Sequence, residues 1–229
     1  MLHFTLPAAD ARALPSRLPT ETPAGRACAT VHRLPPRTAL FLQGYARAPL
    51  YRVIEGCVAL SQSLPDGRRQ IIDMIGPGRM LGIGIGEFNR CTAEALSFAT
   101  LEPIVDPDPS TLEHGLEQMV LRAQAHATLL GRKTAPERVA SAILDLAGQF
   151  VRPARGAKRG KLCFNLHPTR GDLADWLGLT VETVSRCFTR LKRAGLIDFT
   201  HPEIVTLLQP EALADIAAGN RSIETLQIP

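Results

Sequence analysis

Residues 169–197, TRGDLADWLGLTVETVSRCFTRLKRAGLI, decide the fold of this chain. Thr169, followed three residues later by an acidic residue, forms a capping box and predicts that a helix begins there. Gly178 then predicts a sharp turn, because glycine adopts left-handed backbone conformations without steric cost. Thr180 caps a second helix, which Gly195 ends. The stretch therefore predicts a helix-turn-helix.

The second helix is expected to have one buried and one exposed face. Apolar residues recur at helical spacing from Val184 to Leu191 and predict the buried face. A helix that presents polar residues of its first turns outwards is suited to the DNA major groove, where Arg donates to guanine and Glu accepts from cytosine. The alternative is a solvated face with an incidental ion pair. We predict that the base-reading residues are Glu182, Ser185 and Arg186.

Basic residues concentrate around this unit. Residues 152–200 contain ten Lys or Arg and four Asp or Glu, although the whole chain has a net charge of only +4. Such a cluster beside a helix-turn-helix is typical of phosphate contact with double-stranded DNA. We predict that the residues on the DNA backbone are Thr169, Arg170, Thr180, Thr183 and Arg190.

The length and composition fit a globular protein of two domains. The chain has 229 residues, 45% of them apolar, and no apolar run approaches the roughly 20 residues of a membrane span. The first residues lack the pattern of a secretory signal, so we expect a cytoplasmic protein without membrane contact. No paired carboxylates, Ser-His-Asp set or phosphate loop is present, so we expect no enzymatic activity.

Residues 1–27 are rich in Pro, Ala and Arg and are interpreted as a flexible N-terminal arm. Residues 28–109 contain short apolar runs separated by glycines, which predict a small antiparallel β-barrel or jelly-roll. Asp66-Gly67 is the strongest hairpin signal within it. The expected strands lie within residues 40–42, 50–54, 57–64, 70–75 and 80–85.

Residues 110–134 are predicted to form one long helix. Its apolar residues alternate at spacings of three and four, a coiled-coil-like pattern along which two copies of the chain would pair as a homodimer. The alternative is that the helix merely covers the barrel. The predicted interface residues are Leu112, Leu116, Met119, Ala123, His126 and Leu130.

Residues 135–229 hold the helix-turn-helix and its flanking elements. The expected elements are a helix at 136–150, a basic loop at 152–161, a strand at 162–166, a hairpin formed by 196–200 and 204–208, and a helix at 210–218. The hairpin would be the wing of a winged helix-turn-helix, which makes the whole chain an α+β protein.

This order of elements resembles the Crp/Fnr family of bacterial transcription regulators. Tyr51–Gly56 with Pro65–Ile72 is similar to the family's cyclic-nucleotide-binding barrel, Gly131–Ala140 to the junction in its FixK-like branch, and Thr169–Ile197 to its DNA-reading unit. The resemblance implies a sensor domain, a dimerisation helix and a DNA-binding domain. It also implies RNA polymerase as a partner.

The pattern Glu-x-x-Ser-Arg at residues 182–186 is similar to Fnr-type members of the family. It implies half-sites that contain TTGA, arranged as an inverted repeat. Arg186 and Glu182 would then share the G·C pair, and Ser185 would contact a neighbouring thymine. The FixK-like branch implies a transcription activator in a low-oxygen, redox or nitrogen-oxide response.

The sensor region departs from the family's cyclic-nucleotide binders. Those proteins carry Gly-Glu-Leu for the ribose and Arg-Ser or Arg-Thr for the phosphate, whereas this chain has Gly82-Ile83-Gly84 and Cys91-Thr92. Two charge-assisted contacts are therefore missing. We expect regulation without a cyclic nucleotide.

The five cysteines are scattered, and none forms a C-x-x-C pair. The Fnr oxygen sensor holds an iron–sulfur cluster on closely spaced N-terminal cysteines, but this arm offers only Cys28, so we expect no such cluster and no bound metal. Cys187 beside Arg186 is a candidate redox thiol. Its helical angle, however, favours burial with the core.

We therefore expect no cofactor. The alternative is a ligand-gated regulator of the same family, with haem or another small molecule in the barrel. His32 and His126 are the candidate axial ligands for haem.

Overall fold

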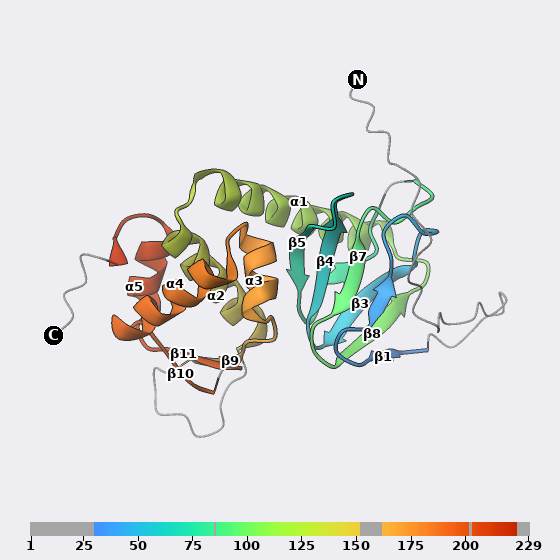
Figure 1. The fold of residues 1–229 in the computed structure, drawn as a ribbon. Coiled ribbons are helices and arrows are strands. Elements are labelled where there is room, and N and C mark those ends of the chain that lie inside the picture. Colours follow the sequence, from blue (N-terminus) through green and yellow to red (C-terminus); the bar gives the residue numbers. More distant parts are fainter. Residues whose placement is uncertain (1–29, 85, 152–161, 202, 224–229) are drawn as a thin grey trace.

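The computed structural model describes residues 30–84, 86–151, 162–201 and 203–223. The predicted N-terminal arm, Cys28 and the basic loop at 152–161 lie outside these residues. Two lobes are joined by a long helix, which runs above the helical lobe and behind the sheets of the other lobe in Figure 1. No helix in the described part of the chain is long and apolar enough to cross a membrane.

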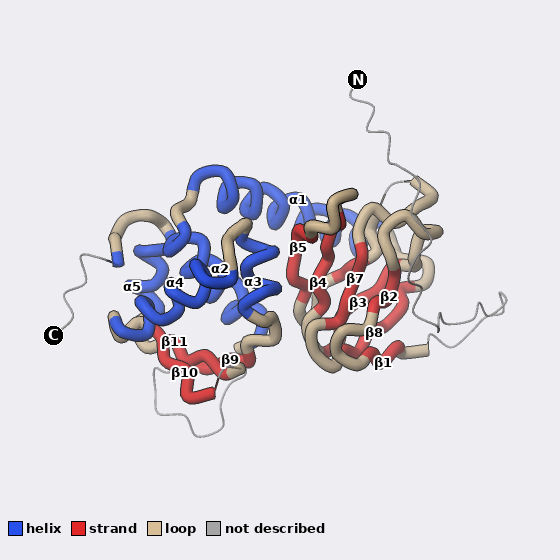
Figure 2. The backbone as a smooth tube through the Cα atoms, viewed as in Figure 1, coloured by secondary structure: helices blue, strands red, loops and turns tan. Residues whose placement is uncertain are grey.

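The first lobe consists of two four-stranded sheets, ordered β1-β8-β3-β6 and β2-β7-β4-β5, in which every pairing is antiparallel. Figure 2 shows the strands gathered on one side of the molecule. The predicted β-barrel or jelly-roll is therefore confirmed. Its strands are β1 (His32–Leu34), β2 (Ala39–Phe41), β3 (Leu50–Glu55), β4 (Val58–Ser63), β5 (Arg69–Ile75), β6 (Met80–Leu81), β7 (Thr92–Ala95) and β8 (Ala99–Ile104).

The Asp66-Gly67 hairpin is confirmed between β4 and β5. Gly67 has a φ of 85°, and its amide donates to the carbonyl of Leu64 at 3.0 Å. The run at 80–85, in contrast, forms a strand of only two residues. Gly82 ends it with a φ of 90°, and a side chain at this glycine would collide with the backbone of Pro49.

Helix α1 (Pro109–Arg132) begins at Asp108, whose carboxylate accepts the amide of Thr111 at 3.0 Å. Its first half packs on the sensor domain so closely that a Cβ at Gly115 would collide with Met80. The colliding atoms are the ends of the Met80 and Ile83 side chains, so a larger residue at position 115 would require these side chains to move. The helix then continues beyond the sheets to the second lobe (Figure 1).

The second lobe is a winged helix-turn-helix, as predicted. Its three-stranded antiparallel sheet has the order β10-β11-β9 and lies below the helices in Figure 1. Its elements are α2 (Ala135–Phe150), β9 (Leu162–Asn165), α3 (Arg170–Leu177), α4 (Val181–Arg193), β10 (Ile197–His201), β11 (Ile204–Leu207) and α5 (Pro210–Ala217).

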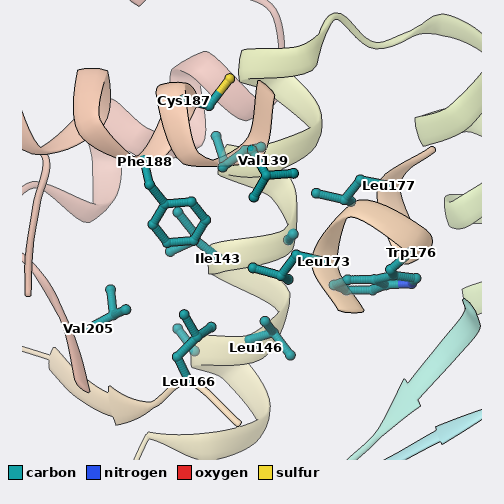
Figure 3. Close-up of a cluster of buried hydrophobic side chains, with 14 of the residues drawn as sticks. Val139, Ile143, Leu146, Leu166, Leu173, Trp176, Leu177, Cys187, Phe188 and Val205 are labelled. Atoms are coloured by element: carbon teal, nitrogen blue, oxygen red, sulfur yellow. The ribbon is translucent and has the colours of Figure 1, made fainter. Parts of the chain in front are cut away.

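The core of this lobe gathers around α2. Figure 3 shows Val139, Ile143 and Leu146 of α2 beside side chains of α3 and α4. Leu173 of α3 is 1% exposed and Phe188 of α4 is 2% exposed. Burial of such side chains stabilises the fold by about 1.5–3 kcal/mol each. Helix α2 therefore holds the two helices of the reading unit in a fixed relation.

Candidate DNA-binding site

The two helices of the reading unit begin as the sequence predicts. The Thr169 hydroxyl accepts the amide of Asp172 at 3.1 Å, and the Asp172 carboxylate accepts the amide of Thr169 at 2.9 Å. Gly178 has a φ of 61° and forms the turn. Thr180 then accepts the amide of Thr183 at 3.1 Å. These caps satisfy amides that a helix start leaves without partners.

Helix α4 has the two faces that its sequence predicts. Val184, Phe188 and Leu191 are buried against the rest of the lobe, and Cys187 is buried beside them at 4% exposure. Burial raises the pKa of the Cys187 thiol. A protonated thiol reacts poorly with oxidants, so its surroundings are those of a core residue.

The three predicted base-reading residues all lie on the exposed face of α4. The side chains of Arg186 and Glu182 are 75% and 72% exposed, and they form an ion pair with 2.5 Å between Nη2 and Oε1. Ser185 is exposed between them. An exposed pair of this kind contributes little to stability. Both groups are therefore available to exchange this contact for another partner.

The predicted backbone-contact residues have different surroundings. Thr180 and Arg190 are exposed, and Thr183 is half-buried at the first turn of α4. Thr169 is exposed, but its hydroxyl is engaged with Asp172. The Arg170 guanidinium stacks inwards, 3.4 Å from the centre of the Phe188 ring.

Burial lowers the pKa of Arg170 to about 10. The guanidinium therefore remains charged at neutral pH. Its stacking on the Phe188 ring is a cation–π contact, which stabilises the core of the lobe.

Sequence reasoning missed an ionic cluster on the other side of α3. Asp172 contributes more than a cap, because Arg37 donates to both of its carboxylate oxygens at 2.9 and 2.7 Å. Arg69 donates to the same carboxylate at 2.9 Å and to Asp175, also at 2.9 Å. Only the acidic residues of α3 gave a signal in the sequence, and nothing there indicated their partners.

The predicted dimer residues of α1 divide into two groups. Leu116 and Met119 are each 43% exposed, and Ala123 is also exposed. Leu112 and Leu116 line an open groove of 710 Å³ with Val120, whereas Met119 lies at the edge of this face and also lines the pocket between α1 and the sensor domain. The apolar face of the first half thus lacks a cover within the described residues of one chain.

The predicted dimer residues in the second half of α1, His126 and Leu130, pack against other residues of the same chain. The ring of His126 stacks on Trp176 of α3 with 6.1 Å between the centres. Leu130 packs beside Gly178. Burial lowers the pKa of His126. Helical periodicity could not separate these positions from the exposed ones, because both groups need the same apolar spacing.

The sensor domain contains a pocket of 310 Å³ between β5, β6 and α1. Gly82 and Ile83 line it at the place of the family's Gly-Glu-Leu motif and supply no carboxylate, and the carboxylate that does line the pocket, Asp73, is paired with Arg122. The hydroxyl of Thr92 accepts the amide of Gln43 at 3.1 Å and is used within the fold.

The candidate haem ligands lie outside this sensor pocket. His32 packs edge-on against Tyr51, and His126 lies at the junction with α3. No group of three or more His, Cys, Asp or Glu that could hold a metal ion is found in the described ranges. Arg79 does line the pocket, and its buried Nη1 has no hydrogen-bond partner among the described residues.

Two family models match the chain. A cyclic nucleotide-binding domain matches residues 31–101, and a Crp-like helix-turn-helix domain matches residues 137–216. Together they match more than half of the sequence and follow the two lobes of the structure.

Individual relatives agree with the models. The nitrogen fixation regulation protein FixK of Rhizobium meliloti (strain 1021) is 33% identical over 79% of this chain and 84% of its own length. FixK of Azorhizobium caulinodans is 38% identical over 72% of this chain and 69% of its own length. The fumarate and nitrate reduction regulatory protein of Escherichia coli (strain K12) is 28% identical over 80% of this chain and 77% of its own length.

The structure of FixK2 from Bradyrhizobium japonicum superposes with a TM-score of 0.72. The match covers 83% of this chain and 98% of that one at 28% identity. Sequence, fold and the exposed recognition helix therefore agree: the chain belongs to the Crp/Fnr family of DNA-binding transcription regulators, whose members are regulators rather than enzymes.

Proposed function

We propose that this protein is a homodimeric transcription activator that reads an inverted repeat of TTGA-type half-sites. The observation that carries the proposal is the exposed face of α4, where Glu182 and Arg186 stand side by side. These are the two residues that would share one G·C pair, with Arg donating to guanine and Glu accepting from cytosine. The neighbouring Ser185 would reach the adjacent thymine.

Dimerisation is supported by the exposed apolar face of α1. Leu116, Met119 and Val120 are each more than 40% exposed on one helix. Pairing of this face with a second copy would bury it and place two reading units on the same side of a DNA duplex. The two-fold symmetry of the dimer would match the inverted repeat.

The signal is proposed from the relatives. Their names refer to nitrogen fixation and to fumarate and nitrate reduction, which suggests a low-oxygen, redox or nitrogen-oxide response in the bacterial cytoplasm. An activator of this kind would recruit RNA polymerase. Because the chain has Gly82-Ile83-Gly84 and Cys91-Thr92 in place of the family's two nucleotide-binding motifs, we propose that DNA binding needs no cyclic nucleotide.

A ligand-gated regulator is the second candidate, and one observation favours it. The Arg79 guanidinium lines the sensor pocket, its buried Nη1 has no hydrogen-bond partner within the described part of the chain, and burial lowers the pKa of this group. A buried donor without a partner is costly and calls for a ligand, an ion or water. An anionic small molecule would meet this need.

Binding of the untreated protein to a TTGA inverted-repeat duplex, followed by fluorescence anisotropy, tests the proposed function. A scrambled duplex of equal length at the same salt concentration is the control, because phosphate contacts depend on salt. We expect tight binding to the repeat alone. Equal binding to both duplexes would contradict the proposed reading.

The absorption spectrum of the same sample tests the haem form of the second candidate. We expect a colourless protein that binds the repeat. A Soret band, together with DNA binding only when the chromophore is present, would favour the ligand-gated form.

A further inference from the structure

Five charged side chains meet where α3 contacts the sensor domain, and we call this cluster the arginine clamp. Arg37, Arg69 and Glu94 come from the sensor domain, and Asp172 and Asp175 come from α3. Figure 1 shows α3 facing β5 across this boundary.

Asp172 is the centre of the clamp. Its side chain is only 2% exposed, yet it accepts two hydrogen bonds from Arg37 and one from Arg69. The same carboxylate accepts the amide and the hydroxyl of Thr169, at 2.9 and 2.7 Å. One buried group thus joins the start of the helix-turn-helix to the sensor domain.

Glu94 supports the arginines from the sensor side. Its carboxylate lies 3.3 Å from Arg37 and 3.6 Å from Arg69. Both guanidinium groups are therefore held between acids of the two domains. Charge-assisted, bidentate contacts of this type are directional, so they fix orientation as well as distance.

The backbone of Arg37 is strained. Its φ of 65° lies in the left-handed region, which a long L side chain rarely occupies. Strain of this kind persists only where the surrounding structure imposes it, and it clusters at functional positions. The conformation is maintained at a residue whose guanidinium reaches across the domain boundary to Asp172.

The clamped arrangement leaves the recognition face uncovered. The side chains of Glu182 and Arg186 are more than 70% exposed on α4 while Asp172 is held on α3. Gln70 adds a further contact between the sensor domain and α3, because its side-chain amide donates to the backbone carbonyl of Trp176 at 3.2 Å. The clamp is therefore compatible with bound DNA.

We propose that Arg37 and Arg69 are positioning residues for operator recognition. By holding Asp172 and Asp175, they fix the orientation of the reading unit on the sensor domain and so set the distance between the two recognition helices of a dimer. This proposal rests on the proposed function. Two half-sites about one helical turn, roughly 34 Å, apart can be occupied together only when that distance is correct.

The test compares a full inverted repeat with a single half-site, using Arg37→Asn/Arg69→Gln. Asparagine tolerates the left-handed backbone at position 37 while it removes the guanidinium. The matched control, Arg33→Gln/Arg47→Gln, removes the same charge from two exposed positions of the sensor domain. Both proteins and the parent are measured by anisotropy at one salt concentration.

We expect the clamp variant to bind the full repeat about tenfold more weakly than the control, because fewer dimers hold both reading units in place. Affinity for the single half-site should be unchanged. The variant should also tolerate one or two extra base pairs between half-sites better than the parent. Unchanged affinity for the full repeat, or an equal loss on the half-site, would overturn the positioning role.

A second measurement is independent of the DNA sequence. Trp176 is the single tryptophan of the chain, is 4% exposed, and lies on α3 beside the sensor domain. We expect its fluorescence to shift to longer wavelength in the clamp variant and not in the control. If the parent does not prefer the TTGA repeat, the proposed function fails. The clamp is then judged on Trp176 alone, and an unshifted emission overturns it.

Discussion

Helices α3 and α4 begin with the same chemistry and end with opposite roles. Each is capped by a threonine and carries an acidic residue in its first turn. The acid of α3, Asp172, has a side chain 2% exposed, whereas that of α4, Glu182, is 72% exposed. One carboxylate is committed to the fold and the other is available to a partner. The difference arises from what each helix faces and not from its own sequence pattern.

The two helices of the reading unit therefore have different roles. Buried charges are strongly destabilising once a partner is removed, whereas exposed pairs contribute little. Changes on α3 should therefore affect stability and domain orientation, and changes on α4 should affect DNA binding.

The largest expected effect is on stability, from Asp172→Ala. The change removes the most buried acceptor of Arg37 and Arg69 and one half of the capping box of α3, but the two arginines keep Glu94 and are 45% and 28% exposed, so we expect a loss of about 1.5–3 kcal/mol in the free energy of unfolding. Urea denaturation measures it. Asp175→Ala is the control, because that carboxylate is 37% exposed and should cost less than about 1 kcal/mol. Equal losses would show that α3 is not anchored through Asp172.

The same carboxyl predicts a pH dependence. Burial by itself would raise the pKa of Asp172, but hydrogen bonds from Arg37, Thr169 and Arg69 outweigh burial and hold this pKa well below its ordinary value. The folded form therefore binds this proton less readily than the unfolded chain. The contribution of the Asp172 carboxylate to the free energy of unfolding is complete above about pH 4 and is lost as the pH falls below that. Asp172→Asn should flatten this part of the stability profile.

The largest expected effect on DNA binding comes from Arg186→Ala. The change removes the donor to guanine and should cost about 1–3 kcal/mol of discrimination at that base pair. Stability should stay within about 0.5 kcal/mol, because the side chain is 75% exposed. Competition with duplexes substituted at the guanine measures the effect. If every base preference survives, α4 does not enter the groove as proposed.

Local patterns predicted the reading unit because its determinants are close in sequence. The caps at Thr169 and Thr180 and the turn at Gly178 involve contacts within a few residues. The arginine clamp was not predictable in this way, since Arg37 and Asp172 are 135 residues apart. Strands β1, β7 and β8 were not identified individually for a related reason, because short strands depend on partners that lie far along the chain.

A smaller effect is expected on dimerisation through the long helix α1. Met119→Glu places a charge on the exposed apolar face and, in a dimer, brings two like charges together. We expect dimerisation to weaken by about tenfold or more. Sedimentation velocity across a concentration series measures it. His126→Gln is the comparison, because His126 stacks on Trp176 within one chain and should leave dimerisation unchanged. An unaltered dimer in Met119→Glu would remove this face from the interface.

The smallest expected effect distinguishes the two caps. Thr180→Ala removes one hydroxyl that accepts the Thr183 amide, so we expect a loss of about 1 kcal/mol in the free energy of unfolding. Thr169→Ala should cost more, because the Thr169 hydroxyl also donates to Asp172 and supports the carboxylate that the arginine clamp holds. Thr180→Ser keeps the cap and should behave as the parent. Urea denaturation of the three variants separates a cap that only starts a helix from one that also anchors a domain.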